Sequence, residues 1–222
     1  MASTHRTPSQ RRAALPYGHT PMSATELSST LEVLDTLSPH DLRRRISAMV
    51  ALARGAGATA ADMRYLTGED VSTVADAGTW VSFRRPGFER TVPVSCHFGP
   101  ELYRLARQAR TRTLIGDRGQ TTPLPASCPQ GLAETLQTEV AKNHPDLLVT
   151  IERLRRAWLV DQLRGALPVR DFLDLTGERS WQTTHDLLDF CPASSLVPTQ
   201  LARLTGGVDD LELIDLEPWG LD

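Results

Sequence analysis

Apolar residues recur at helical spacing over most of the chain. Near the N-terminus, Leu27, Leu31, Leu34 and Leu37 lie three or four positions apart, which predicts a helix over residues 25–37. The same periodicity, with Pro39 or Thr59 at a helix start and Gly55 at a stop, predicts further helices over residues 39–54, 59–66, 99–110, 130–142, 146–164, 168–175 and 180–190.

One segment has the character of strands. Residues 80–83 and 91–94 are rich in β-branched and aromatic residues, and residues 84–87 (Arg-Arg-Pro-Gly) between them favour a turn. The pattern predicts a β-hairpin over about residues 79–94, and the Pro-rich residues 121–129 predict a loop. We therefore expect an α+β fold that is mainly helical, with one small antiparallel sheet.

The two ends of the chain differ from its middle. Residues 1–24 are rich in Ser, Thr, Pro and Arg without an apolar period, so we expect a disordered basic arm. Residues 193–222 form an acidic tail, and residues 195–222 carry a net charge of −5 from six acids and one arginine. Between the ends we expect one domain over residues 25–192, a normal size for this length.

Composition excludes several classes of protein. The chain has no apolar run of about 18 residues and no signal-peptide core, so we expect a cytoplasmic protein that does not enter a membrane. Cys96, Cys128 and Cys191 lack metal-ligand spacing, and we find no Gly-rich phosphate loop. We therefore expect no disulfide framework, no metal and no cofactor.

The basic residues are almost all arginine. Of the 24 Lys and Arg residues, only Lys142 is a lysine, which is typical of a GC-rich genome. The formal net charge of −3 does not indicate a dedicated nucleic-acid-binding protein. Arginine nevertheless holds phosphate with two parallel hydrogen bonds, so the positions of the arginines matter more than the total charge.

Three segments, taken together, form a recognisable pattern. Residues 57–71 start with Gly57, carry an acid at Asp62 and end with the pair Glu69-Asp70 and a valine. This order resembles the Gly-Leu-Arg-hydrophobic-Ser-Glu-Leu motif of tyrosine recombinases (phage integrases) and the acidic pair that follows it. In this alignment, the family's first catalytic arginine falls on Thr59.

The other two segments follow in the family's order. Residues 89–94 (Glu-Arg-Thr-Val-Pro-Val) are similar to the end of the family's hairpin, which places its turn lysine on Arg85. Residues 152–156 (Glu-Arg-Leu-Arg-Arg) resemble the family's His-x-x-Arg-His, and Arg155 keeps the arginine. Residues 176–178 (Thr-Gly-Glu) then align with the family's Leu-Gly-His motif.

The resemblance implies a tyrosine-recombinase catalytic-domain-like fold over roughly residues 40–190, without most of the chemistry. The family's catalytic positions fall on Thr59, Arg85, Glu152, Arg155, Glu178 and Leu187. Leu187, at the position of the nucleophilic tyrosine, has no hydroxyl to attack a phosphodiester. Glu152 and Glu178, at histidine positions, would repel the phosphate. We therefore predict no catalytic residue and no enzymatic activity.

The arginines near these positions have two interpretations. They could form a DNA-binding patch of Arg84, Arg85, Arg90, Arg153, Arg155 and Arg156. Alternatively, the arginines of residues 153–156 lie on a solvated helix face, and Arg155 pairs with Glu152 or Glu178.

Three functional hypotheses follow. The first is a catalytically inactive recombinase-like protein that binds DNA or a DNA-processing partner, as an accessory or regulatory factor, for example of a mobile element. The second is a protein-interaction scaffold without DNA binding, which contacts a partner or a second copy through the tail of residues 195–222. The third is a residual strand-cleaving integrase, for which we find no nucleophile.

Overall fold

The computed structural model describes residues 17–117, 120, 122–165, 167–178 and 181–191. By its contacts the chain divides into two units, Met1–Phe190 and Cys191–Asp222, and the elements described below lie in the first. The predicted tail of residues 193–222 and the first 16 residues of the predicted arm lie outside the described residues.

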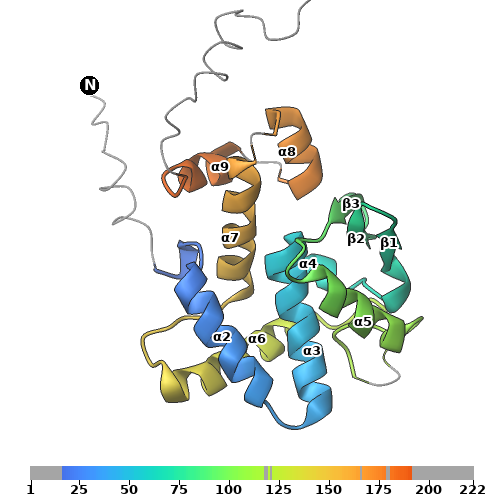
Figure 1. The fold of residues 1–222 in the computed structure, drawn as a ribbon, viewed down its shortest axis with the longest axis vertical. Helices are drawn as coiled ribbons and strands as arrows, with labels where there is room; N and C mark the ends of the chain where they lie inside the picture. Colours follow the sequence, from blue (N-terminus) through green and yellow to red (C-terminus); the bar gives the residue numbers. More distant parts are fainter. Residues whose placement is uncertain (1–16, 118–119, 121, 166, 179–180, 192–222) are drawn as a thin grey trace, which may run out of the picture. The chain divides into compact units, whose positions relative to one another are not determined.

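Helices make up most of the described chain, with one small sheet at one side, next to α4 and α5 (Figure 1). In order, the elements are η1 (Tyr17–His19), α2 (Ala24–Thr36), α3 (His40–Val50), η2 (Ala51–Gly55), α4 (Ala60–Met63), η3 (Gly68–Asp70), β1 (Val71–Val74), β2 (Gly78–Phe83), β3 (Arg90–Pro93), α5 (Gly99–Ala109), α6 (Ser127–Asn143), α7 (Ile151–Arg164), α8 (Val169–Thr176) and α9 (Trp181–Leu188). The predicted α+β class is confirmed. No helix within the described ranges is long and apolar enough to span a bilayer.

The sheet has three antiparallel strands in the order β1-β2-β3, one more than the predicted hairpin. Val71 pairs with Val81, and Val81 pairs with Val92, so three buried valines form a row across one face. Only the first residue of β1 is buried, and its other residues face solvent. The strand therefore lacks the alternation of apolar and polar residues from which it could have been predicted.

Two predicted helix boundaries are wrong by several residues. α6 begins at Ser127, inside the predicted loop of residues 121–129. α7 begins at Ile151 instead of residue 146, because Thr150 caps it: the Thr150 backbone is extended and its Oγ1 accepts a hydrogen bond from the Arg153 amide at 3.1 Å.

α7 is the central helix of this fold. It contacts η1, η2, α3, α8 and α9 (Figure 1). Its apolar side chains Leu154, Trp158 and Leu159 are almost completely buried. Around them lie the other large apolar side chains of the core, among them Ile46, Met49, Leu52, Met63, Leu66, Leu102, Leu105, Leu114 and Ile115. Burial of each such side chain stabilises the fold by roughly 1.5–3 kcal/mol, which makes this core the main source of stability.

The segment after η2 approaches α7 so closely that only glycine fits. Gly57 has a φ of +65°, and a Cβ atom there would lie 2.1 Å from the Trp158 ring. This contact fixes the start of α4 against α7. It also directs the Gly57 carbonyl towards Arg155, whose Nε donates to it at 2.9 Å.

Residues 17–23 pack on α7, which corrects the predicted boundary of the arm at residue 24. Arg153 Nε donates to the Thr20 carbonyl at 3.0 Å, and Arg156 Nη1 donates to the His19 carbonyl at 2.8 Å. This segment has no apolar period of its own. Hydrogen bonds from α7 hold its backbone in place. The sequence pattern therefore does not distinguish it from a disordered arm.

Gly57→Ala should lower the free energy of unfolding by about 3 kcal/mol or more, since it adds both left-handed strain and a clash with Trp158. Gly87→Ala is the matched control: Gly87 has a φ of +74°, but a Cβ added there would meet nothing within 4 Å, so strain alone should cost about 1–2 kcal/mol. Urea denaturation measures both. Equal losses would contradict the close approach of Gly57 to Trp158.

Candidate functional site

The family's catalytic positions lie on several separate elements. Thr59 immediately precedes α4, and Arg85 lies in the turn between β2 and β3. Glu152 and Arg155 lie on α7, and the last two positions are Glu178, after α8, and Leu187, on α9. What each side chain contacts decides whether the group can still bind or cleave a phosphodiester.

The Arg155 guanidinium is bound on every nitrogen by the chain itself. Nε donates to the Gly57 carbonyl, Nη2 donates to the Thr176 carbonyl at 3.0 Å, and Nη1 pairs with Glu178 Oε1 at 2.6 Å. The Arg155 side chain is only 5% exposed, and that of Glu178 is 16% exposed. Of the two interpretations of Arg155, the ion pair is therefore the one found, and its partner is Glu178.

A second buried carboxylate, Asp62, holds the arginines of the hairpin. Asp62 Oδ2 accepts a hydrogen bond from Arg90 Nη2 at 2.8 Å, and Arg85 Nη1 lies 3.9 Å from Oδ1. The Arg90 guanidinium also lies over the Phe83 ring, 4.2 Å from its centroid. Together these contacts join α4 to the sheet through one acid.

The pKa of Asp62 lies below its usual range. Burial raises the pKa of this carboxyl, but the hydrogen bond and positive charge of Arg90, with two hydrogen bonds from Thr59, outweigh burial and lower it. Asp62 is therefore ionised at neutral pH, and the carboxylate stabilises the fold as long as it keeps its charge.

Thr59 and Leu187 have structural roles at positions where the family has catalytic residues. Thr59 caps α4: its Oγ1 accepts a hydrogen bond from the Asp62 amide at 3.1 Å, and its own amide donates to Asp62 Oδ2 at 3.0 Å. Leu187 is fully buried on α9. A side chain that packs in the core cannot present a reactive group to DNA.

The expectation that the arginines of α7 form a solvated face is wrong. Arg153, Arg155 and Arg156 are only 1%, 4% and 8% exposed. Arg153 Nη2 contacts both carboxylate oxygens of Glu26, at 2.8 and 2.9 Å. Arg156 Nε donates to Glu152 Oε1 at 2.7 Å. The helix uses these charges to hold neighbouring segments.

The arginines of the predicted DNA-binding patch differ in their accessibility. Four of its six arginines are turned inward: Arg90, Arg153, Arg155 and Arg156. A phosphate could reach their guanidinium groups only if internal hydrogen bonds broke first, which for Arg90 would leave the buried Asp62 unpaired. Arg84 and Arg85 stay accessible, with side chains 67% and 30% exposed, although Arg84 also pairs with Asp70.

A largely apolar groove of about 560 Å³ lies beside these positions, and Thr59 and Glu152 both line it. Its other lining residues come from α4, α6 and the segment before α7: Ala60, Gln130, Ala133, Glu134, Gln137, Thr138, Leu148, Val149, Thr150 and Ile151. No lysine or arginine belongs to this lining. Within the described ranges, no three His, Cys, Asp or Glu side chains are grouped so that they could hold a metal ion.

Sequence reasoning missed two acids that organise this region, Asp62 as a counter-ion and Glu26 as the partner of Arg153. A local signal was present for both. Thr59 and Ser23 each precede an acid by three residues, which is the pattern of a helix capping box, and both capping boxes form. The arginine partners, however, lie far away along the chain.

Glu178→Ala should destabilise the protein by about 3 kcal/mol, because it leaves the buried Arg155 charge unpaired. Asp174→Ala removes an acid from the exposed Arg170 pair and should change stability by less than about 0.5 kcal/mol. Guanidinium denaturation gives both values. The double change Arg155→Met with Glu178→Leu should recover most of the loss. An unchanged stability in Glu178→Ala would show that the pair is not structural.

Asp62→Asn should reduce stability at pH 7 and flatten its dependence on acid pH. Since the folded pKa of Asp62 is lowered, its contribution is complete above the unfolded-state pKa of about 3.9 and is lost as pH falls through the folded pKa. The wild-type and variant unfolding free energies should therefore converge in acid. Parallel curves in urea titrations from pH 7 to pH 2 would contradict this role.

Comparisons with solved structures show what this framework resembles. XerA recombinase is 16% identical, with a TM-score of 0.57, over 89% of this chain and 67% of that chain. XerH recombinase bound to its difH substrate is 14% identical, with a TM-score of 0.58, over 78% of this chain and 50% of that chain. The Tn1549 transposon integrase with transposon right end DNA is 13% identical, with a TM-score of 0.61, over 87% and 68%.

The chain thus spans between 50% and 68% of the length of these three proteins. No family model matches the sequence, and no curated protein matches it. The arrangement of helices around the three-stranded sheet agrees with these neighbours, and the fold is that of a tyrosine-recombinase catalytic domain.

Proposed function

We propose that this protein is a catalytically inactive, recombinase-like accessory factor of DNA processing that acts by binding and does not cleave DNA. The observation that carries the proposal is that the Arg155 guanidinium is hydrogen-bonded to Glu178, Gly57 and Thr176. A recombinase needs this guanidinium to neutralise a phosphoryl oxygen, and here each of its three nitrogens already donates to the chain and its charge is paired with Glu178.

The other family positions support the absence of cleavage. Leu187 has no nucleophilic oxygen and is buried. Thr59 has no charge, and its hydroxyl caps α4. Glu152 and Glu134 line the adjacent groove with negative charge, which opposes the approach of a phosphate. Restoring a single residue would not restore this chemistry.

DNA is the partner we propose, because fold neighbours such as the XerH recombinase and the Tn1549 integrase are described in complexes with DNA. The accessible cations of the predicted patch are Arg84 and Arg85, at the turn of the hairpin. Two contacts of this kind give modest, salt-sensitive and sequence-independent affinity. Such binding suits an accessory role in the cytoplasm, for example with a mobile element.

A specific observation favours a second function, a protein-interaction scaffold without DNA binding. The groove beside Thr59 and Glu152 is mainly apolar and has acids but no cations in its lining. A surface of this composition fits an apolar or basic segment of a protein better than it fits DNA. The two functions share the loss of cleavage and differ in whether DNA binds at all.

Incubation with a suicide DNA substrate, from which a cleaved strand diffuses away, should give no covalent protein–DNA adduct on a denaturing gel. Leu187→Tyr should also give none, because Arg155 stays bound to Glu178 and the first arginine position stays Thr59. A covalent adduct with the wild-type chain would overturn the proposal of inactivity.

DNA binding should weaken as salt rises, and the double change Arg84→Ala with Arg85→Ala should reduce the slope of log K against log salt by about 2. Arg170→Ala removes an exposed arginine on α8 and is the control, with an unchanged slope expected. Fluorescence anisotropy with a labelled duplex measures the slope. No binding of any duplex at low salt would reject DNA as the partner and leave the scaffold function.

A further inference from the structure

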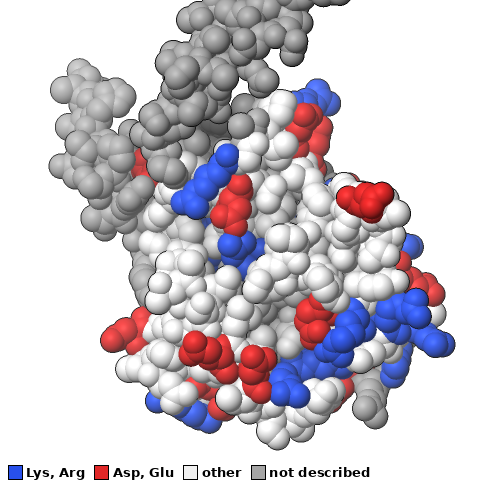
Figure 2. Space-filling view, in the orientation of Figure 1, with Lys and Arg blue, Asp and Glu red and all other residues white. Residues whose placement is uncertain are grey.

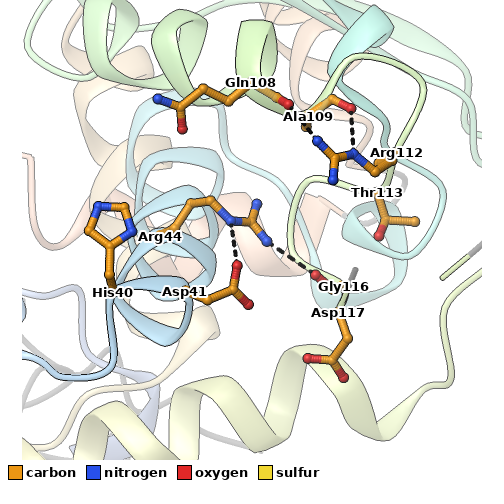
Figure 3. Close-up of a pocket in the computed structure, with 9 residues that line it drawn as sticks. All are labelled: His40, Asp41, Arg44, Gln108, Ala109, Arg112, Thr113, Gly116 and Asp117. Atoms are coloured by element: carbon orange, nitrogen blue, oxygen red, sulfur yellow. Dashed lines mark hydrogen bonds and ion pairs between the residues drawn. The ribbon is translucent and has the colours of Figure 1, made fainter. Parts of the chain in front are cut away.

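We propose that a second pocket, remote in sequence from the recombinase positions, binds the oxyanion group of a small phosphorylated or carboxylated molecule. The pocket of about 330 Å³ lies between the start of α3 and the segment that follows α5 (Figure 3). It is lined by His40, Asp41, Arg44, Gln108, Ala109, Arg112, Thr113, Gly116 and Asp117. None of the residues aligned with recombinase catalytic positions belongs to it.

Two guanidinium groups from distant parts of the chain face this pocket. Arg44 comes from α3 and Arg112 from the segment after α5, and Figure 3 shows their guanidinium groups directed towards each other. All three Arg44 nitrogens already bind groups of the chain, whereas Arg112 Nη1 donates to no described residue. Arg112 therefore offers a donor of the kind that phosphate and carboxylate oxygens accept. The figure also shows the His40 ring beside Arg44.

Hydrogen bonds hold the pocket open in one shape. Arg44 Nη1 and Nη2 donate to the Leu114 and Gly116 carbonyls at 3.0 and 3.3 Å. From the same helix, Arg45 Nε donates to the Ile115 carbonyl at 2.8 Å. The backbone of the segment is therefore fixed against α3, and a ligand would meet a pocket whose wall is already in place.

A buried hydroxyl without a partner is the observation that points to a ligand. Thr113 is only 3% exposed, and its Oγ1 makes no hydrogen bond to the described residues. The hydroxyl lies close to the Gly116 backbone, where a Cβ atom would be 2.2 Å from it, so the glycine leaves it room. A buried hydroxyl with no partner costs free energy, and a ligand oxygen in the pocket would recover it.

The balance of charge in and around the pocket favours an anion. Asp41 pairs with Arg44 at 3.1 Å, and Asp117 pairs with Arg45. Arg112 has no carboxylate partner within the described ranges: its Nε and Nη2 donate to main-chain carbonyls at the end of α5, at 3.3 and 3.0 Å. Arg112 is therefore not neutralised by a carboxylate. The two arginines and two aspartates of the lining balance, and Arg45, the partner of Asp117, brings the group to one net positive charge.

The shape of the site favours a small molecule over a DNA backbone. Its volume lies at the lower end of ligand pockets, which hold about 300–1,000 Å³. A concave site with donors on several sides surrounds one oxyanion group. Basic side chains are also most numerous over α5 and the first half of α3 on the face seen in Figure 2, and they would draw an anion towards this region.

Titration calorimetry with inorganic phosphate, a nucleoside monophosphate and malonate, at matched ionic strength, tests the site. The wild-type chain should bind phosphate or malonate saturably, and the stronger of the two identifies the group that the pocket takes. Arg112→Ala should weaken binding about tenfold or more, because it removes a charged donor. Arg110→Ala removes an exposed arginine two residues away that does not line the pocket, and its affinity should be unchanged.

Thr113→Val gives a readout that a purely structural role would not produce. It removes the unpartnered hydroxyl and keeps the shape of the side chain, so the free energy of unfolding should be unchanged or higher. Affinity for the anion should nevertheless fall about threefold to tenfold. Loss of stability with unchanged affinity would overturn the role of this hydroxyl.

Three results would reject the site: no saturable binding of any of the three probes, equal weakening by Arg110→Ala and Arg112→Ala, or Arg112-dependent binding of duplex DNA alone. The last result would assign the surface to DNA. The site does not depend on the proposed function, since a chain that binds no DNA can still bind phosphate in this pocket.

Discussion

The fold around the positions aligned with the family's catalytic residues depends on one buried cation, Arg155. Its three nitrogens join α7 to Gly57, in the segment between η2 and α4, and to the end of α8. A guanidinium in this position must be fully hydrogen-bonded, because an unpaired buried charge costs several kcal/mol. The surrounding residues meet most of this requirement: Glu178 supplies the countercharge, and Gly57 and Thr176 supply carbonyls. A group that would serve transition-state stabilisation in an enzyme serves here to connect three elements.

Asp62 extends this arrangement into the sheet. Its carboxylate binds Arg90, which stacks on Phe83. It also accepts the hydrogen bond of the Thr59 amide in the capping box of α4. The ion pair of Arg155 on α7 with Glu178 and the ion pair of Arg90 with Asp62 between β3 and α4 are thus two buried charge pairs in this region. Such a network is sensitive to the removal of any one member, while replacement of whole pairs by apolar residues of similar size is often tolerated. The charged pairs fix how separate elements are placed against each other. A uniformly apolar core would define this placement less sharply.

The sequence predicts those parts of this picture that depend on local patterns. Helical periodicity located α2, α5 and α8 to within about two residues. The family resemblance narrowed the partner of Arg155 to two acids, of which Glu178 is the one found. The pairing of Arg153 with Glu26 could not be predicted, because 127 positions separate them. Short β1 was missed for a related reason: its stability comes from pairing with β2, and its own residues show no alternation.

The pairing of Glu26 with Arg153 also has a consequence for synthesis. A ribosome makes the α2 segment first, and the arginine that anchors it appears 127 residues later. At about 5–20 residues per second, α2 waits roughly 6–25 s before its partner exists. During this interval α2 can pack on α3 and α6, which are made before α7, but Glu26 has no guanidinium to pair with. The ion pair that joins the two ends of the fold therefore forms only when α7 has been made.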